Sequence, residues 1–303
     1  MVSNVRMNRP GLVISGHGRH VLIETDSGER ILCHPRGKKN LALVGDRVEW
    51  LASNDEGTIE KILPRKNEFY RQDELRTKSF AANIDQLLIL IAAEPEFSEV
   101  QLSKALIAAH AAQINAIIVL NKSDLIKPFE AAFKRLAPYQ AMKYEVRALS
   151  IQENKEAFKE LLASLRGKVT LLLGPSGVGK STFINTAIPH TNLWTQEISQ
   201  ALNSGKHTTT TTTLYWVDSD RQTALIDSPG FQSFGIHQID PHALGRYMPD
   251  IQAHLSGCKF YNCTHLHEPN CEVQAAVQQG LITPSRYRIY QQLFEELSQP
   301  KNY

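Results

Sequence analysis

The stretch Gly174–Ser181 constrains the fold of this chain more than any other. It has the sequence GPSGVGKS, which matches G-x-x-x-x-G-K-[ST], and it lies between the apolar stretch Val169–Leu173 and an expected helix, Lys180–Ala187. A strand, a glycine-rich loop and a helix in this order are typical of a phosphate-binding loop, in which backbone N–H groups and a helix N-terminus surround phosphate oxygens. A chance glycine-rich turn would not have this setting. We therefore expect an α/β domain with a parallel or mostly parallel sheet.

Each part of this loop has an expected task. Gly177 and Gly179 let backbone N–H groups turn inward. Lys180 should reach the β and γ phosphates, and Ser181 should hold Mg²⁺. The residues expected to contact nucleotide here are Gly174, Pro175, Ser176, Gly177, Val178, Gly179, Lys180, Ser181 and Thr182.

A second motif predicts which base is bound. Asn121-Lys122-Ser123-Asp124 directly follows the apolar stretch Ala116–Leu120. The carboxylate of Asp124 can accept both the N1–H and N2–H₂ donors of guanine, which adenine lacks. Asn121 can bridge base and protein, and the stem of Lys122 can lie along the purine. A polar turn is the alternative for the motif alone, but the phosphate loop favours a guanine nucleotide site.

Two further segments are expected at the γ-phosphate and Mg²⁺. Asp227-Ser228-Pro229-Gly230 closes the strand candidate Thr223–Ile226, with Asp227 suited to Mg²⁺ and the N–H of Gly230 to the γ-phosphate. Between this motif and the phosphate loop lies GKHTTT at 205–210, where one threonine can complete the Mg²⁺ shell. We favour Thr209, with Thr208 and Thr210 left open. A plain β-turn and an edge strand are the alternatives.

The order of these motifs is unusual. Small GTPases usually carry the phosphate loop first and NKxD late, whereas here NKSD precedes the phosphate loop, which gives the order G4, G5, G1, G2, G3. Ser150, after the strand candidate Tyr144–Ala148, is a loose match to the fifth, guanine-contacting element. The remaining strand candidates are Ile84–Ala92 and Leu214–Val217, and the remaining helix candidates are Glu99–Ala112, Phe129–Leu136 and Glu153–Leu165. Six strands fit a circularly permuted GTPase sheet.

The flanking regions have different patterns. Five short strand candidates separated by turn signals predict a small N-terminal barrel such as an OB-fold; they are Gly11–Ser15, His20–Thr25, Arg30–His34, Arg47–Leu51 and Thr58–Ile62. A loop with Arg36, Lys38 and Lys39 either contacts RNA phosphates or is simply solvated. After position 240 the pattern is helical, over His242–Leu255, Val273–Gln279 and Pro284–Leu297. We expect a multidomain chain: OB-fold 1–67, linker 68–80, permuted α/β P-loop GTPase domain 81–239 and a mostly helical zinc-binding domain 240–303.

The C-terminal cysteines indicate a metal. Cys258, Cys263, His265 and Cys271 supply three thiolates and one imidazole, the donors of a closed structural zinc site. The irregular spacing leaves His267 as a rival ligand, and four unligated side chains are the other alternative. Because a closed site has no open position, we expect the zinc to fold this segment rather than to catalyse. Cys33 is expected to be a buried small hydrophobe.

Composition excludes several classes of protein. Of 303 residues, 42% are hydrophobic and 21% charged, which excludes a mainly disordered chain. Lys plus Arg number 33 and Asp plus Glu 31, so the net charge of +2 does not by itself indicate a nucleic-acid binder. The longest apolar run, Leu87–Ala93, is too short to span a membrane, and the N-terminus has no apolar secretory segment. We expect a cytoplasmic protein with no membrane partner.

Taken together, the motifs resemble those of the RsgA (YjeQ, EngC) family of circularly permuted GTPases of small ribosomal subunit biogenesis. The resemblance covers nearly the whole chain and is carried by Asn121–Asp124, Gly174–Thr182, the GKHTTT stretch, Asp227–Gly230 and the cysteine cluster. It implies a GTPase that binds the maturing small subunit and its rRNA late in assembly, alongside other assembly factors, and hydrolyses GTP to GDP and phosphate under stimulation by the subunit. It also favours His265 as the zinc ligand. Nothing in the sequence demands a dimer, so we expect a monomer.

The hydrolytic step needs a group that orients water. Ras-like enzymes use a glutamine after D-x-x-G, where this chain has Phe231. On chemistry and on the family resemblance we expect His207 to take that role, with Lys180 as the second catalytic residue; the alternative is that His207 only packs against RNA or a loop. Three alternative functions remain for the chain as a whole. They are an ATP-using P-loop enzyme, a non-catalytic RNA-binding protein whose bound nucleotide has only a structural role, and a GTPase acting on another RNA.

Overall fold

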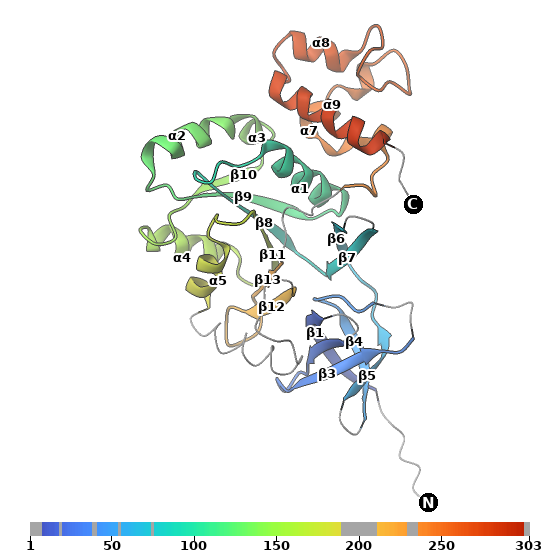
Figure 1. Cartoon of the computed structure of the whole chain (residues 1–303), viewed down its shortest axis with the longest axis vertical. Helices are drawn as coiled ribbons and strands as arrows, with labels where there is room; N and C mark the ends of the chain where they lie inside the picture. Colours follow the sequence, from blue (N-terminus) through green and yellow to red (C-terminus); the bar gives the residue numbers. More distant parts are fainter. Residues whose placement is uncertain are drawn as a thin grey trace, which may run out of the picture.

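The computed structural model describes residues 8–17, 20–37, 41–53, 56–73, 76–188, 211–228 and 236–299. Its first part is the expected five-stranded barrel, at the bottom of Figure 1. The strands are β1 (Arg9–His17), β2 (His20–Glu24), β3 (Arg30–Pro35), β4 (Arg47–Ala52) and β5 (Gly57–Ile62). They pair in the order β1-β2-β3-β5-β4, and β4 pairs back onto β1, which closes the barrel around Val13, Ile23, Cys33 and Trp50. The predicted OB-fold barrel and the buried position of Cys33 are confirmed.

The second part is the nucleotide-domain sheet. Its strands are β8 (Gln86–Ala92), β9 (Asn115–Asn121), β10 (Glu145–Ala148), β11 (Val169–Leu173), β12 (Thr213–Trp216) and β13 (Ala224–Asp227), in the order β10-β9-β8-β11-β13-β12. All neighbours are parallel except β12 and β13. All seven residues of β8 are buried, as expected for a central strand covered on both faces. All six predicted strands are therefore present.

Helices cover both faces of this sheet. α1 (Glu99–Ala111), α2 (Ile126–Arg135) and the short α3 (Ala137–Ala141) pack in the large core, which contains Leu87, Ile89 and Ile91 of β8. α4 (Lys155–Ser164) and α5 (Lys180–Ala187) pack on the other face, against Leu88 and Leu90. The alternation of these side chains follows from the strand period of two. Figure 1 shows α4 and α5 apart from α1 to α3.

The prediction of a linker at 68–80 was wrong. Most of it forms a β-hairpin of β6 (Glu68–Asp73) and β7 (Arg76–Ala82). Its polar composition suggested a linker, but Phe69 and Phe80 are buried, with ring centroids 6.0 Å apart, and join the core that includes β8. The hairpin is thus anchored by two aromatic side chains.

The C-terminal region is mostly helical, as expected, but one predicted helix is broken. Residues His242–Leu255 form the 3-10 helix η3 (Pro241–Tyr247), the short α7 (Pro249–Gln252) and the start of η4 (Leu255–Gly257). Pro249 is the physical reason, because proline disfavours helical conformation in the residue before it, and Met248 is extended. The later helices are α8 (Glu272–Gln278) and α9 (Pro284–Ser298), close to the prediction.

A buried arginine attaches this region to the nucleotide domain. Arg286 of α9, 3% exposed, donates to Asp250 at 2.7 Å and to Ser103 of α1 at 2.6 Å, and lies 5.1 Å from the ring centroid of Tyr139. Lys104 of α1 adds an ion pair to Glu296 at 2.6 Å. In the part of the chain that the structure describes, no helix is both long and apolar enough to cross a bilayer.

Candidate nucleotide site and metal centre

Four strands of the sheet end at the same edge with the predicted nucleotide-binding residues. Asn121 is the last residue of β9 and Asp227 the last of β13, while the phosphate loop follows β11 and Ser150 follows β10. The parallel register places Asp227 beside Leu172, one strand from the loop. Carboxyl ends of parallel strands are where α/β sheets bind ligands, so the fold brings together motifs that are about a hundred residues apart in sequence.

The phosphate loop depends on glycine at two close approaches. Gly179 begins α5 with φ +103°, and a Cβ there would lie 2.7 Å from Nδ2 of Asn121. A Cβ on Gly174 would overlap the carbonyl oxygen of Leu90. Any side chain at either position would displace the loop from β8 or from the base motif.

Charged groups of opposite sign lie in the same loop region. Nζ of Lys180 donates to the carbonyls of Gly174 at 2.6 Å and Pro175 at 3.1 Å. Burial lowers the pKa of Lys180, with a smaller opposing effect from Asp227, and burial raises the pKa of the Asp227 carboxyl, with Lys180 opposing. Two partly desolvated charges of this kind are suited to a bound phosphate and its cation. Ser181 is exposed in the first turn of α5.

The base motif is tied to the phosphate loop by Asn121. Its side chain, 4% exposed, donates to the carbonyl of Val178 at 2.8 Å and accepts from the N–H of Ile151 at 3.3 Å. Lys122 has φ +64°, which turns the chain after β9, and leaves Asp124 exposed. The amide of Asn121 therefore fixes the phosphate loop, the base motif and the segment after β10 relative to one another.

Ser150, the loosest of the sequence matches, lies beside Asp124, the carboxylate predicted to recognise the base. Its hydroxyl donates to Oδ1 of Asp124 at 2.7 Å, and the N–H of Ser123 donates to the carbonyl of Leu149 at 3.0 Å. Among the described residues, the predicted guanine site is thus assembled from two neighbouring strand ends.

Some predicted residues lie outside the described part of the chain. They are Lys38, Lys39, His207, Thr208, Thr209, Thr210, Gly230 and Phe231. Arg36 is described and exposed, and its guanidinium pairs with Glu60 at 2.5 Å.

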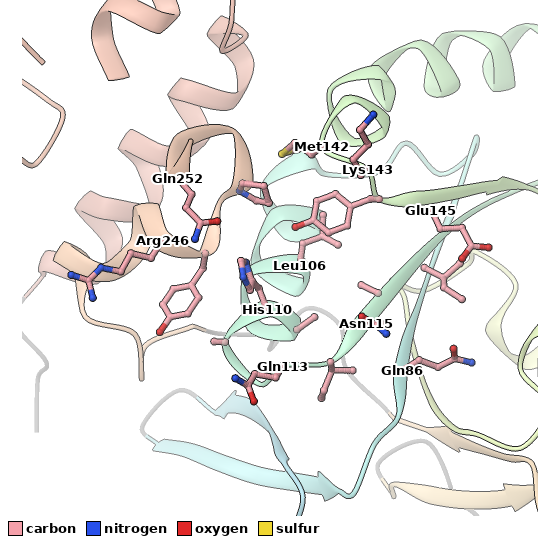
Figure 2. Close-up of a pocket in the computed structure, with 18 of the residues that line it drawn as sticks. Gln86, Leu106, His110, Gln113, Asn115, Met142, Lys143, Glu145, Arg246 and Gln252 are labelled. Atoms are coloured by element: carbon pink, nitrogen blue, oxygen red, sulfur yellow. The ribbon is translucent and has the colours of Figure 1, made fainter. Parts of the chain in front are cut away.

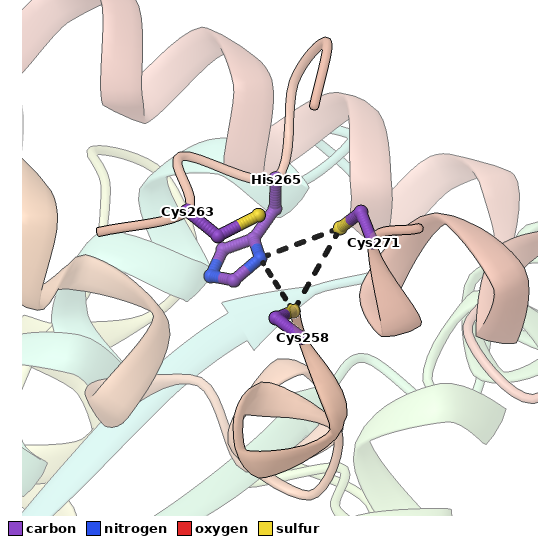
Figure 3. Close-up of side chains that lie close together, drawn as sticks. All are labelled: Cys258, Cys263, His265 and Cys271. Carbon is purple, nitrogen blue, oxygen red and sulfur yellow. Dashed lines mark hydrogen bonds between the residues drawn. The ribbon is translucent and has the colours of Figure 1, made fainter. Parts of the chain in front are cut away.

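The predicted metal ligands form one cluster (Figure 3). The donor atoms of Cys258, Cys263, His265 and Cys271 all lie within 4.8 Å of one another, and Nδ1 of His265 is 3.4 Å from the sulfur of Cys258. A tetrahedral zinc ion with Zn–S bonds of about 2.3 Å separates two sulfurs by about 3.8 Å. The sulfurs of Cys258 and Cys271 are 3.9 Å apart, so the donor set fits zinc. His267 is exposed and is not among these four ligands.

The backbone around these ligands is held by residues that sequence reasoning missed. The carboxylate of Glu268 accepts from the N–H and hydroxyl of Thr264 at 2.7 and 2.6 Å and from the N–H of Leu266 at 3.2 Å. From α9, Tyr287 donates to the carbonyl of His265 at 2.7 Å and Tyr290 to that of Thr264 at 2.9 Å. The spacing of Thr264 and Glu268 was the available signal for this tight loop.

A cavity of about 1050 Å³ lies at the opposite end of the strands from the nucleotide site (Figure 2). It is bounded by the starts of β8 and β9 at Gln86 and Asn115, by the end of α1 at His110, and by Tyr247 and Gln252 of the C-terminal region. None of the predicted site residues lines it, so it is separate from the predicted nucleotide site.

Comparisons with known proteins agree with this geometry. A family model described as RsgA GTPase matches residues 62–237. The chain is 61% identical over 304 residues to the small ribosomal subunit biogenesis GTPase RsgA of Variovorax paradoxus, covering 99% of this chain and 96% of that protein. It is 31% identical to the solved structure of YjeQ from Thermotoga maritima, with a TM-score of 0.73 over 97% of this chain and 100% of that one. YloQ, whose structure is described as a circularly permuted GTPase, matches with 28% identity and a TM-score of 0.71, covering 99% of both chains.

Proposed function

The chain belongs to the RsgA GTPase family, and we propose that it binds and hydrolyses GTP at the edge formed by β9, β10, β11 and β13 under stimulation by the small ribosomal subunit. It is a GTP hydrolase of small ribosomal subunit biogenesis, like the curated relatives that it matches. The observation that carries the site assignment is the bond from Asn121 to Val178, because it joins guanine recognition to phosphate binding.

The residues of the site divide into four tasks. Asp124, oriented by Ser150, binds the guanine N–H donors beside Asn121, Lys122 and Ser123. The loop residues 174–182 hold the phosphates, with Lys180 on the β and γ phosphates and Gly230 on the γ-phosphate. Ser181, Thr209 and Asp227 are suited to Mg²⁺, which, when bound, offsets the charge that develops on the phosphate oxygens. His207 orients the attacking water.

The C-terminal cluster holds one structural Zn²⁺. Cys258, Cys263, His265 and Cys271 supply four ligands, which satisfies a tetrahedral ion and leaves no position for a substrate. The zinc therefore stabilises a loop-rich segment that buries little apolar surface of its own.

The wider setting is also proposed. The barrel (residues 1–67) contacts rRNA of the subunit through basic residues such as Arg36, the β6–β7 hairpin stands between it and the GTPase domain (81–239) in the chain, and the zinc-binding region spans 240–303. The chain acts as a monomer in the cytoplasm, on a particle that carries other assembly factors. The oxygen-rich phosphate backbone of rRNA is the chemistry that Arg36 would meet.

The deciding experiment measures GTP hydrolysis by the purified protein alone and with small subunits, large subunits or tRNA. We expect strong stimulation by small subunits only, and a large preference for GDP over ADP in binding. Equal weak hydrolysis in all mixtures would remove the proposed partner but keep the GTPase. Equal affinity for ADP would point to an ATP-using enzyme, and slow exchange without hydrolysis to a nucleotide plug.

A further inference from the structure

The barrel and the nucleotide domain meet at a specific junction. Strand β12 pairs with β1 of the barrel as well as with β13, so the barrel and the nucleotide-domain sheet form one eleven-stranded sheet. We call the contact between the barrel and the β12–β13 hairpin the barrel–hairpin junction. Its members are Ser15, Glu24, Gly28 and Arg30 of the barrel and Thr212, Thr213, Trp216 and Arg221 of the hairpin and its N-terminal flank.

One row of paired residues crosses the junction to the nucleotide site. Ser15 of β1 pairs with Thr213 of β12, Thr213 pairs with Asp227 of β13, and Asp227 pairs with Leu172 of β11. The hydroxyls of Ser15 and Thr213 are 3.3 Å apart, and both residues are buried. The barrel is therefore two strands away from the carboxylate assigned to magnesium.

A buried carboxylate of the barrel accepts a hydrogen bond across the junction. Glu24, 4% exposed, accepts a hydrogen bond from the indole N–H of Trp216 at 2.7 Å. Arg30 and Arg221 place their Nε atoms 3.5 and 3.6 Å from its oxygens. Because a buried carboxylate without donors is costly, Glu24 favours the arrangement that keeps Trp216 and Arg221 in place.

The turn of the hairpin is also fitted to the barrel. Arg221 has φ +54° in the β12–β13 turn, and its guanidinium lies so close to Gly28, at φ +88° in the β2–β3 turn, that a Cβ on Gly28 would overlap it. Both ends of the hairpin are thus held by the barrel: one through Thr213 and the other through Trp216 and Arg221. A shift of the barrel has to move the hairpin or break these contacts.

We propose that the barrel–hairpin junction couples the binding of a ligand to the barrel with the Asp227 end of the nucleotide site. Glu24 and Trp216 are the positioning residues. This proposal rests on the proposed function, in which the small subunit stimulates hydrolysis. A ligand that favours one position of the barrel also favours one position of β12 and β13. By linkage, the nucleotide bound at the site shifts the equilibrium between barrel positions by the same coupling free energy. Neither residue touches the nucleotide; each acts through the strands that end at Thr213 and Asp227.

The first arm of the test uses the protein without ribosomes. Hydrogen exchange of the β1 and β2 amides is compared with GDP and with a non-hydrolysable GTP analogue bound. We expect a difference of about fivefold or more in wild type that is lost in Trp216→Phe and Glu24→Gln. Trp50→Phe is the matched control, because it also removes one indole N–H bond, to the carbonyl of Pro10 at 3.2 Å, but within the barrel. No nucleotide dependence in wild type, or a wild-type difference in both junction variants, overturns the proposal.

The second arm measures hydrolysis at saturating small subunits. We expect Trp216→Phe and Glu24→Gln to lose most of the stimulated kcat while the KM for GTP, the unstimulated rate and GDP affinity stay at wild-type values, a split that general destabilisation would not produce. Arg221→Gln, which changes an exposed side chain outside the hydrophobic core clusters, serves if the Trp216 and Glu24 variants do not fold. Wild-type stimulation in all folded variants overturns the proposal.

The two arms separate this inference from the proposed function. If nucleotide-dependent exchange in β1 is lost in the variants but wild type is not stimulated by small subunits, the junction couples as proposed and the partner is wrong. If wild type is stimulated and the variants are too, the partner stands and the junction does not carry the signal.

Discussion

The hydroxyl of Ser150 donates a 2.7 Å hydrogen bond to Oδ1 of Asp124, across the ends of two neighbouring strands. Asp124 is exposed, so this contact, rather than burial, restricts its carboxylate. A carboxylate that is already oriented loses less conformational entropy when a base binds. On the proposed function, we therefore expect Ser150 to contribute to guanine affinity by holding Asp124.

We predict that Ser150→Ala weakens GDP binding about 10- to 100-fold, because a hydrogen bond to a charged group contributes about 1.5–3 kcal/mol. Isothermal titration calorimetry measures the change. Ser164→Ala, which removes a hydroxyl bonded to the carbonyl of Leu161 on α4, should leave GDP affinity unchanged. Equal GDP affinity in the Ser150 variant and wild type would show that the contact does not orient Asp124.

A pair of glycine variants should separate backbone strain from steric overlap. Gly179 and Gly167 both have positive φ, +103° and +72°, but a Cβ meets Asn121 only at Gly179 and meets nothing within 4 Å at Gly167. We expect both alanine variants to lose about 1 kcal/mol of stability, and only Gly179→Ala to lose nucleotide affinity, by about tenfold or more. Chemical denaturation and GDP titration measure the two effects. Normal GDP binding by Gly179→Ala would contradict the proposed packing.

His207→Ala should bind GTP normally and lose hydrolysis that is stimulated by the subunit, because it removes the group proposed to orient water. Single-turnover hydrolysis with saturating small subunits measures this, with His254→Ala in the C-terminal region as a control. Stimulated turnover at the wild-type rate would remove His207 from the mechanism.

Loss of zinc should unfold the loop that carries its ligands. We expect Cys263→Ser, or treatment with a chelator, to lower zinc content and the helical circular dichroism signal, since most residues of the loop 258–271 are exposed or half-buried and the loop depends on its four ligands. Cys33→Ala should keep one zinc per chain, because Cys33 lies in the barrel. Native helicity in the metal-free protein would argue against a structural role.

The acid sensitivity of the β6–β7 hairpin should depend on Glu68. Burial disfavours its charged form, but hydrogen bonds from Arg65, at 2.8 Å, and from Ser79 outweigh burial and lower the pKa of this carboxyl. Because the native pKa is below the unfolded value, ionised Glu68 stabilises the fold above the ordinary carboxyl pKa, and this stabilisation disappears as the pH falls through the native pKa.

Glu68→Gln should therefore be less stable than wild type at neutral pH, and the difference should shrink towards pH 3. Thermal unfolding at a series of pH values measures it, with the exposed Glu156→Gln as the control. A stability difference that does not change with pH would mean that Glu68 acts through its shape alone.

Local sequence signals predicted most of the fold. The strands before and after the phosphate loop lie within a few residues of their predicted ranges, because a short apolar run bounded by turn residues indicates a buried strand without further information. Two local predictions were wrong. Residues 68–80 are so polar that their sequence did not suggest a pair of strands. The sequence does show Pro249, which breaks the helix, but the helical pattern on either side of it outweighed this signal.

Contacts between distant residues were not predictable from one sequence. Glu24 and Trp216 form a hydrogen bond across 192 positions, and Arg286 reaches Ser103 across 183. Neither pair has a spacing or a motif, because the contact depends on how whole domains pack. The nucleotide-binding and zinc-binding residues could be predicted for the opposite reason, because the residues of each motif lie close together in the sequence.

The pairing of Ser15 with Thr213, 198 positions apart, has a consequence for biosynthesis. A ribosome makes the barrel first, then the base motif, then the phosphate loop, and Asp227 after all of these. β1 already pairs with β2 and, over Arg9–Leu12, with β4, so only the part of its edge at Ser15 waits for β12 through most of translation and is open to other chains until then. If Asp227 holds the magnesium ion as proposed, the nucleotide site is complete only once β13 pairs with β11, and GTP and GDP then favour the completed chain over its precursors.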